Sequence, residues 1–499
     1  MLRTSSYTIY VDLPDSRDEM LLVHGYTGAY DRVSRRVANY LRSLESKRPP
    51  KPLYGEWLSE PDLPDEVTPP GEETLKLLES RGYLTKFDRE KEQEFFGRLA
   101  LKLAERSAHQ PPSYIFMPTY SCNLRCPYCF QDHMRTDPNF KHLLRTMSTD
   151  MVDRYFKALP AIEAEHGIDA GPDHERNIGF FGGEPLLAAN RSIVEYIMEK
   201  ARSMGNAVFW AVSNATEIEA YDGLLGPEGI AQIQITLDGP PDEHNQRRVY
   251  PDGSGSFDKI ARNIDFALER GVMISVRLNI DRNNIDDIPR LAEVIASYRW
   301  PEHRNFNVYT APIHASNEKT DRKTTFNSWE LDKALTEMRE EHPHTTFIGR
   351  PDEGIRVRAR QIFDQKELIP NLRPHFCGAH DGMYILDSFG DLYACWEKTG
   401  DAKIRLGHVD ADSNVHFQLP VKKEWRTRSV ASNPVCKQCR YALHCGGGCA
   451  ILALGQRGTM HANYCDGYAS RFRASIAEAY VGFRDGKEAI ELQEKVCDL

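Results

Sequence analysis

The sequence predicts an α/β protein built around a parallel sheet. Strand-like and helix-like segments alternate between residues 113 and 313. The expected strands are residues 113–119, 177–183, 207–214, 231–238, 273–280 and 305–313, and the expected helices are residues 149–166, 190–204, 218–226, 256–270 and 284–299. Connections of this length require parallel strands. Six such repeats are too few for a closed eight-stranded barrel.

Composition narrows the class of protein. The chain has 499 residues, of which 40% are apolar and 27% charged, as in ordinary soluble proteins. Its net charge of −10 argues against a general nucleic-acid binder, and no stretch approaches the roughly 20 apolar residues of a membrane helix. With no apolar signal segment at the N-terminus, we expect a cytoplasmic protein. Its 11 cysteines are then better explained as metal or cluster ligands than as disulfides.

The first cysteine group lies in one short loop. Cys122, Cys126 and Cys129 follow an apolar run, residues 114–117, which is expected to be a buried strand. Thiolates are the usual ligands of iron–sulfur clusters, which normally take about four of them. Three from one loop leave one iron free to bind another molecule. Three core cysteines, or part of a zinc knuckle, are the alternatives.

This loop resembles the signature of the radical S-adenosylmethionine (radical SAM) enzymes, C-x3-C-x2-C with an aromatic residue, here Tyr128, before the last cysteine. The resemblance implies a six-stranded partial TIM barrel. It also implies a 4Fe–4S cluster on Cys122, Cys126 and Cys129, whose free iron chelates S-adenosylmethionine. One electron then splits the sulfonium and releases a deoxyadenosyl radical, which abstracts a hydrogen from the substrate.

Residues at the ends of the expected strands fit the same resemblance. Gly182, Gly183 and Glu184 follow the second strand, where the family binds the amino group of S-adenosylmethionine. A tight turn is the alternative for this run. Ser213 and Asn214 end the third strand, and in the family they face the ribose and the methionine portion. Helix capping is the alternative for this pair.

The fourth and fifth strands carry further matches. The peptide-modifying and sulfatase-maturing branches often show D-G-x4-H-D-x2-R after strand four, and this chain matches at Asp238, Gly239, His244 and Arg248. Asn245 stands where aspartate is usual, which weakens any prediction of an acid there. Arg277 is expected to face inward on strand five. The carboxylate of S-adenosylmethionine would pair with it, and a structural salt bridge is the alternative.

The second cysteine group lies between residues 377 and 465. On its own it could hold zinc. Beside the first motif it resembles the seven-cysteine SPASM domain, whose spacing fits Cys377, Gly390, Cys395, Cys436, Cys439, Cys445, Cys449 and Cys465. The resemblance implies two auxiliary 4Fe–4S clusters, one on Cys377, Cys395 and Cys449 and the other on Cys436, Cys439, Cys445 and Cys465. The cluster on Cys377, Cys395 and Cys449, expected to lie nearer the barrel, lacks a fourth cysteine, so His375, His380, water or a substrate thiolate is a candidate ligand.

The N-terminal segment is expected to be a small winged-helix-like domain, with strands at residues 7–13, 20–23 and 83–87 and helices at residues 34–45 and 75–78. It resembles the domains that bind a leader peptide by β-augmentation; a structural cap is the alternative. The expected domains are residues 1–108 (leader recognition), 109–313 (partial barrel), 314–372 (a bridge without chemistry), 373–470 (SPASM) and 471–499 (a helical tail, in which Cys497 is a spare thiol).

Together these matches predict a radical SAM peptide maturase that crosslinks a precursor peptide through a thioether, C–C or C–O bond. A flavodoxin or ferredoxin would donate electrons. Alternatives are a formylglycine-type sulfatase maturase, an epimerase or a backbone-excising enzyme. The sulfatase branch has aspartate directly after the cysteine that matches Cys395, where this chain has Trp396. A non-catalytic metal-binding peptide carrier is the alternative of another class.

Overall fold

The computed structural model describes residues 2–45, 63–64, 66–351, 353–364 and 372–486. The chain forms two compact units. The first contains residues 1–107, 352–380 and 427–499, and the second contains residues 108–351 and 381–426. Among the described residues, none of the helices is long and apolar enough to cross a membrane. Cys497 lies outside the described residues.

The second unit is built on six adjacent parallel strands, which follow one another across the sheet in the order of the sequence. They are β6 (Ser113–Phe116), β7 (Arg176–Phe180), β8 (Ala207–Ser213), β9 (Ile230–Leu237), β10 (Met273–Ile280) and β11 (Phe306–Pro312). The expected strands and their parallel pairing are therefore confirmed. The finer prediction of a partial barrel stays a prediction.

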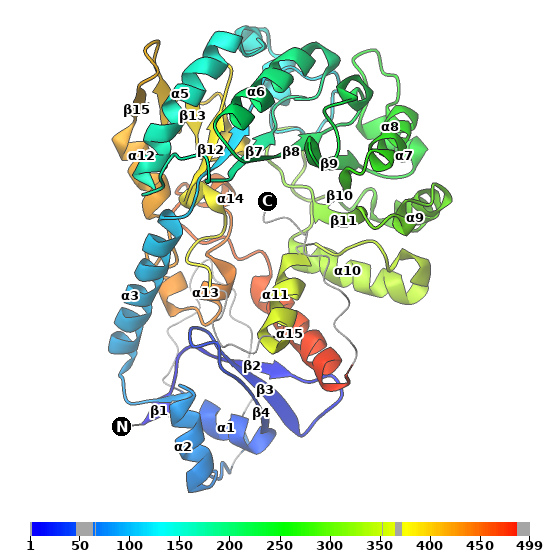
Figure 1. Cartoon of the computed structure of the whole chain (residues 1–499). Coiled ribbons are helices and arrows are strands. Elements are labelled where there is room, and N and C mark those ends of the chain that lie inside the picture. Colours follow the sequence, from blue (N-terminus) through cyan, green and yellow to red (C-terminus); the bar gives the residue numbers. More distant parts are fainter. Residues whose placement is uncertain (1, 46–62, 65, 352, 365–371, 487–499) are drawn as a thin grey trace. The chain divides into compact units, whose positions relative to one another are not determined.

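Helices connect these strands and lie on their outer side (Figure 1). They are α5 (Thr149–Glu165), α6 (Arg191–Ser203), α7 (Pro241–Arg247), α8 (Phe257–Glu269) and α9 (Ile288–Ser297), with α4 (Asp132–Thr136) and α10 (Ser328–Glu341). The expected helix at residues 218–226 is wrong. Only a 3-10 turn forms at Ile218–Tyr221, because Gly223 and Gly226 adopt positive φ angles that end the helical conformation.

The two faces of the parallel sheet differ in chemistry. Ile233, Ile274 and Val276 lie on the buried apolar face. On the opposite face, neighbouring strands align polar side chains: Gln234 pairs in register with Ser275, and Arg277 with Tyr309. The Tyr309 hydroxyl donates to Gln234 Oε1 at 2.7 Å. We call the set Gln234, Ser275, Arg277, Asn307 and Tyr309 the polar face.

The same sheet continues beyond β6. β12 (Met383–Leu386) pairs parallel with β6 and forms an antiparallel hairpin with β13 (Asp391–Tyr393), followed by β14 (Gly407–Val409) and β15 (Val415–Phe417). The turn of this hairpin contains Ser388, Phe389 and Gly390, and Gly390 has a φ of +91°. Asp387 holds the turn by accepting from the backbone N–H groups of Phe389 and Asp391. The helix α12 (Leu419–Thr427) follows.

The first unit contains a three-stranded antiparallel sheet, β2 (Thr8–Asp12), β3 (Glu19–His24) and β4 (Tyr30–Ser34), in that order. Apolar side chains of β2 and β3 pack on α11 (Glu353–Asp364) and α15 (Tyr468–Arg484), while Tyr10, Met20 and Leu22 face α1 (Arg35–Ser43) (Figure 1). The remaining elements are β1 (Arg3–Thr4), β5 (Leu84–Thr85), α2 (Glu72–Ser80), α3 (Arg89–Ala108), α13 (Ala442–Cys445) and α14 (Ala450–Arg457). The expected N-terminal strands and helices are present at these places.

A buried ion pair behind β7 gives a stability test. Arg176 and Glu163 are both fully buried, and two N–H···O bonds of 2.8 and 3.0 Å join them. Glu163→Gln removes the charge that compensates the buried guanidinium, so we expect the free energy of unfolding to fall by about 3–5 kcal/mol. Urea denaturation measures this loss.

The matched control is the double variant Glu163→Leu with Arg176→Met, which removes both charges at once. It should be more stable than Glu163→Gln, since neither side leaves an unpaired ion. A loss below about 1 kcal/mol for Glu163→Gln, typical of an exposed pair, would contradict this account.

Candidate functional site

The three cysteines of the first group lie in the loop that follows β6. Cys126 is buried, and Cys122 and Cys129 are half-buried. Their thiols are close enough to interact electrostatically. Donors surround them: Arg135 Nη2 lies 2.9 Å from Cys129 Sγ, and Asn214 Nδ2 lies 3.7 Å from Cys122 Sγ. The structure therefore brings these predicted residues together at the carboxyl end of the parallel strands.

The donor set fits an iron–sulfur cluster. Burial raises the pKa of the Cys126 thiol to about 12, so this thiol ionises only beside strong positive charge, which bound iron supplies. Within the described ranges, no group of three or more histidine, cysteine or acidic side chains is placed to hold a single metal ion. A four-iron cluster separates its sulfur ligands more widely than one ion does, because each sulfur binds a different iron.

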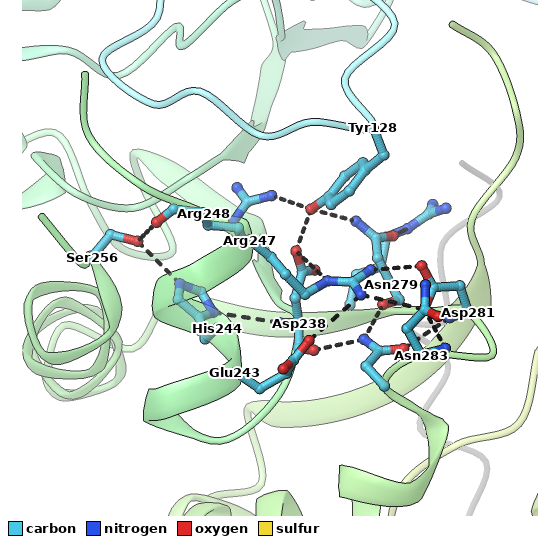
Figure 2. Close-up of polar contacts among 12 residues, drawn as sticks. Tyr128, Asp238, Glu243, His244, Arg247, Arg248, Ser256, Asn279, Asp281 and Asn283 are labelled. Atoms are coloured by element: carbon cyan, nitrogen blue, oxygen red, sulfur yellow. Dashed lines mark hydrogen bonds and ion pairs between the residues drawn. The ribbon is translucent and has the colours of Figure 1, made fainter. Parts of the chain in front are cut away.

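The Tyr128 hydroxyl connects the cysteine loop to the ends of the parallel strands through hydrogen bonds (Figure 2). Its hydroxyl donates to Asp238 Oδ2 at 2.5 Å and accepts from Arg248 Nη1 at 2.8 Å and from Asn279 Nδ2 at 3.3 Å. Burial raises its pKa well above the usual value, so the hydroxyl stays protonated. This predicted residue thus fixes the backbone between Cys126 and Cys129.

The residues of the expected D-G-x4-H motif also converge. His244 Nδ1 lies 3.3 Å from the Asp238 backbone N, and Ser256 Oγ contacts the His244 ring at 3.0 Å (Figure 2). Asp238 is fully buried, and its Oδ1 has no hydrogen-bond partner among the described residues. Asn245 Oδ1 accepts from the N–H of Phe257, the first residue of α8. Asn245 therefore has a structural role at this position.

Gly182 and Gly183 permit a close backbone contact with the cysteine loop. A Cβ on Gly182 would lie 2.5 Å from Thr119 O, and one on Gly183 would lie 2.1 Å from Ser121 O. The Gly183 and Glu184 N–H groups donate to these same carbonyls. The contact with the loop explains both glycines. Their predicted contact with the amino group of S-adenosylmethionine stays a prediction.

Glu184 is a buried acceptor shared by two strand ends. Its carboxylate accepts from Leu186 N at 2.9 Å, from Ser213 Oγ at 2.7 Å and from Asn214 N at 2.5 Å. Burial raises the pKa of Glu184 to about 7. The carboxylate therefore uses its acceptors within the protein and positions the chain at Ser213 and Asn214.

Ser213 and Asn214 do not cap a helix. The N-cap residue of the following 3-10 turn is Glu217. Asn214 instead binds Asn123 Oδ1 at 2.8 Å and approaches Cys122 Sγ, while its Oδ1 accepts from the Thr216 N–H. The capping alternative is wrong, and the contacts of this pair with ribose and methionine stay predictions.

Arg277 lies on β10 in the polar face. Its Nε donates to Asn279 Oδ1 at 2.8 Å, and it interacts electrostatically with Glu397. This interaction leaves the structural alternative open, with Glu397 as the acidic partner. A pairing with the carboxylate of S-adenosylmethionine stays a prediction.

Sequence reasoning missed two residues that hold the loop. Asn317 Nδ2 donates to the carbonyls of Pro127 and Cys129 at 2.8 and 3.0 Å. Arg135 contacts Cys129, as described above. Asn317 lies in residues 314–372, where no chemistry was expected. Neither residue belongs to a recognisable motif, because its contacts depend on the folded loop.

The second cysteine group is divided between the units. In the first unit, the Cys436 thiol interacts electrostatically with those of Cys439, Cys445 and Cys465, the predicted ligands of one auxiliary cluster. Cys377 and Cys449 belong to the same unit, whereas Cys395 belongs to the other. The ligand sets of both auxiliary clusters stay predictions.

Comparisons with known proteins agree with this geometry. The sequence model of the Radical SAM superfamily matches residues 116–295. The cysteine-type anaerobic sulfatase-maturating enzyme of Clostridium novyi (strain NT) is 23% identical over 395 residues, which cover 73% of this chain and 96% of that enzyme. The mycofactocin maturase MftC of Mycolicibacterium smegmatis is 24% identical over 357 residues, covering 69% and 79% of the two chains. The structure of native anSMEcpe with bound AdoMet and Cp18Cys peptide matches with a TM-score of 0.54 and 17% identity, covering 75% of this chain and 100% of that chain.

Glu184→Gln tests the shared acceptor. A glutamine presents an NH₂ group to donors that need an acceptor, so we expect it to cost about 1–3 kcal/mol of unfolding free energy above pH 7. The wild-type carboxyl has a pKa of about 7 in the folded chain, against an ordinary value of 4.5. The folded chain therefore keeps a proton that the unfolded chain loses, and the stability from this site is complete below pH 4.5 and lost as the pH rises to about 7.

A control for this prediction comes from the dependence of stability on pH in two glutamine variants. Glu184→Gln should show a flatter stability profile in this window, whereas Glu199→Gln, an exposed residue of α6, should follow the wild type. Thermal unfolding at a series of pH values measures both. Identical profiles for the two variants would contradict the assigned role of Glu184.

Proposed function

We propose that this chain, whose residues 116–295 match the sequence model of the Radical SAM superfamily, is a peptide maturase that modifies a ribosomally made precursor peptide. The observation that carries this proposal is the convergence of Cys122, Cys126 and Cys129 with Tyr128 and the strand-end residues. We further propose that the six parallel strands form the partial barrel expected of the family, with the polar face inside.

The residues present fit the implied cofactors. Cys122, Cys126 and Cys129 would hold a 4Fe–4S cluster, and Arg135 and Asn214 contact two of their sulfurs. When bound, this cluster and S-adenosylmethionine supply a deoxyadenosyl radical. The buried Asp238 Oδ1, which lacks a partner among the described residues, is available to accept from a bound cofactor.

The polar face supports a peptide substrate. Gln234, Ser275 and Asn307 are aligned across three strands, and Asn307 Nδ2 donates to Ser275 Oγ at 2.9 Å. Amide and hydroxyl side chains can donate to and accept from peptide backbone groups. Relatives whose names describe maturation of sulfatases and of mycofactocin support the same class of substrate. We propose a crosslink of the thioether, C–C or C–O type as the product.

Auxiliary clusters complete the proposal. Cys436, Cys439, Cys445 and Cys465 would hold one, and Cys377, Cys395 and Cys449 would bind the other. The electrostatic interaction of the Cys436 thiol with those of Cys439, Cys445 and Cys465 supports the assignment of the first cluster. The electron donor would be a flavodoxin or a ferredoxin.

A formylglycine-type maturase is the second candidate, favoured by the likeness to sulfatase-maturating enzymes. The aspartate typical of that branch is replaced by Trp396, whose indole packs against Phe181 with ring centroids 5.3 Å apart. Glu397 is the adjacent carboxylate, and it interacts with Arg277. A carboxylate is thus present one residue further along the chain.

The edge strand β4 supports leader binding by the N-terminal domain. His24 N donates to Ala29 O, and Arg35 N donates to Asp18 O. Hydrogen-bonded pairs alternate along an antiparallel ladder, so the backbone N–H and C=O of Arg32, which is opposite Leu21, point away from β3. We propose that a leader peptide adds a strand here.

The main test is turnover. The loaded protein, with S-adenosylmethionine, a reductant and short peptides encoded beside its gene, should yield deoxyadenosine and a peptide lighter by two hydrogens. Cys126→Ala should lose roughly four irons and all turnover, because the loop then has too few thiolates. Iron analysis and mass spectrometry measure these results.

Cys497→Ala is the matched control and should retain both iron and activity. A peptide aldehyde detected by a hydrazide probe would favour the formylglycine candidate over a crosslink. Unchanged iron and turnover in Cys126→Ala would reject the proposed function.

A proline substitution tests the edge strand. Arg32→Pro removes the outward N–H while β3 keeps its own pairing, so we expect at least about a tenfold weaker Kd for the precursor peptide. Arg32→Ala, which keeps the N–H, is the matched control for the lost side chain. Fluorescence anisotropy with a labelled peptide measures both, and equal affinities in the two variants would reject pairing at β4.

A further inference from the structure

Arg428 is a buried cation in the first unit, and it lies beside most of the second cysteine group. Only 3% of the surface of Arg428 is exposed to solvent. Its Nη1 lies 3.3 Å from His380 Nε2, which accepts from it. Its other donors go to backbone carbonyls, those of Gly447, Gly448, Met460 and Ala462. Among the described residues no carboxylate pairs with this guanidinium, which instead interacts electrostatically with the thiol groups of Cys377, Cys436, Cys445 and Cys449.

A run of three glycines shapes the cradle around this guanidinium. Gly446, Gly447 and Gly448 all have positive φ angles, of +75°, +87° and +77°, which side-chain-bearing residues rarely adopt. This conformation directs the Gly447 and Gly448 carbonyls to Arg428 Nη2, at 3.3 and 2.8 Å. The three glycines lie directly between Cys445 and Cys449. Their hydrogen bonds therefore hold the Arg428 guanidinium beside a loop that carries two predicted cluster ligands.

The geometry places sulfur and guanidinium on the same side of the loop. A Cβ built on Gly447 would lie 3.7 Å from Cys436 Sγ and 3.9 Å from Arg428 Nη2. The backbone also joins Arg428 to the segment before Cys377, since His375 Nδ1 lies 2.7 Å from Arg428 O. Through its side chain, Arg428 therefore contacts His380, which follows Cys377, the glycines between Cys445 and Cys449, and Ala462, which precedes Cys465.

Such a cation needs an anion. A buried charge without a counter-ion costs several kcal/mol, and carbonyl dipoles compensate it only in part. The described neighbours offer thiols and no carboxylate, so the compensating charge must come from the sulfurs. Neutral thiols cannot supply it, whereas thiolates bound to iron can.

We propose that Arg428 is the counter-charge of the auxiliary iron–sulfur clusters and raises their reduction potentials. This inference rests on the auxiliary clusters of the proposed function. A 4Fe–4S cluster with four thiolates is negatively charged, and more so after reduction. A fixed positive charge beside it stabilises the reduced form more than the oxidised form. Arg428 is thus a positioning residue that acts through the cluster ligands.

Arg428→Met tests this role in the full-length, cluster-loaded protein. We expect the auxiliary reduction potentials to become more negative by at least a tenfold change in the reduction equilibrium, about 59 mV for one electron. The potential of the cluster at Cys122, Cys126 and Cys129 should not change. Potentiometric titration followed by electron paramagnetic resonance measures both, without any need for turnover.

Three further variants make the test decisive. Arg428→Lys keeps the charge, so its potentials should lie nearer the wild type than those of Arg428→Gln, even if Arg428→Met loses iron. Arg356→Met removes another buried arginine of the same unit, one that lies 3.6 Å from Glu478, and should leave the potentials unchanged.

The iron content of the protein distinguishes a failure of the proposed auxiliary clusters from a failure of the proposed role of Arg428. A wild-type chain with only about four irons would reject the auxiliary clusters themselves, and this inference with them. A chain with about twelve irons whose potentials are the same in Arg428→Lys and Arg428→Gln would reject the role of Arg428 alone.

Discussion

The candidate site depends on the attachment of the cysteine loop to the end of β7. The Gly183 and Glu184 N–H groups donate to the carbonyls of Thr119 and Ser121, a contact that any side chain at position 182 or 183 would prevent. The Glu184 carboxylate then binds the chain at Ser213 and Asn214. Asn214 in turn reaches Cys122. One backbone contact is thus transmitted through a buried carboxylate to a sulfur atom.

The Tyr128 network secures the other end of the same loop. An acid, an arginine and an amide, from three separate segments, meet at one hydroxyl group. Such a network limits the movement of Cys126 and Cys129 without any contact to their sulfurs. Because the network is buried, each member depends on the others for hydrogen-bond satisfaction, and the loop has few alternative conformations.

The sequence was sufficient for the six parallel strands and for the cysteine loop, because hydrophobic periodicity and short-range spacing are local properties. It was insufficient for contacts that only the folded chain creates. Asn317 reaches the loop across about 190 positions, and no pattern around it indicates this. The helix expected at residues 218–226 does not form. Its apolar residues have helical spacing, but Gly223 and Gly226 adopt positive φ angles that end the helical conformation. Gly182 and Gly183 were expected to contact the amino group of S-adenosylmethionine; the neighbour that the structure shows is the cysteine loop, and the cofactor contact stays a prediction.

The division of the chain into two interleaved units has a consequence for biosynthesis. The core around Ile9 and Val11 requires Phe472 and Ile476 of α15, which the ribosome synthesises only after all of the strands β6–β11. The six parallel strands β6–β11, in contrast, have all been synthesised by residue 312. Vectorial synthesis therefore favours early folding of the sheet, while the N-terminal strands wait for their partners. A chain stalled before residue 468 would expose those strands, which makes truncated products natural targets for chaperones and proteases.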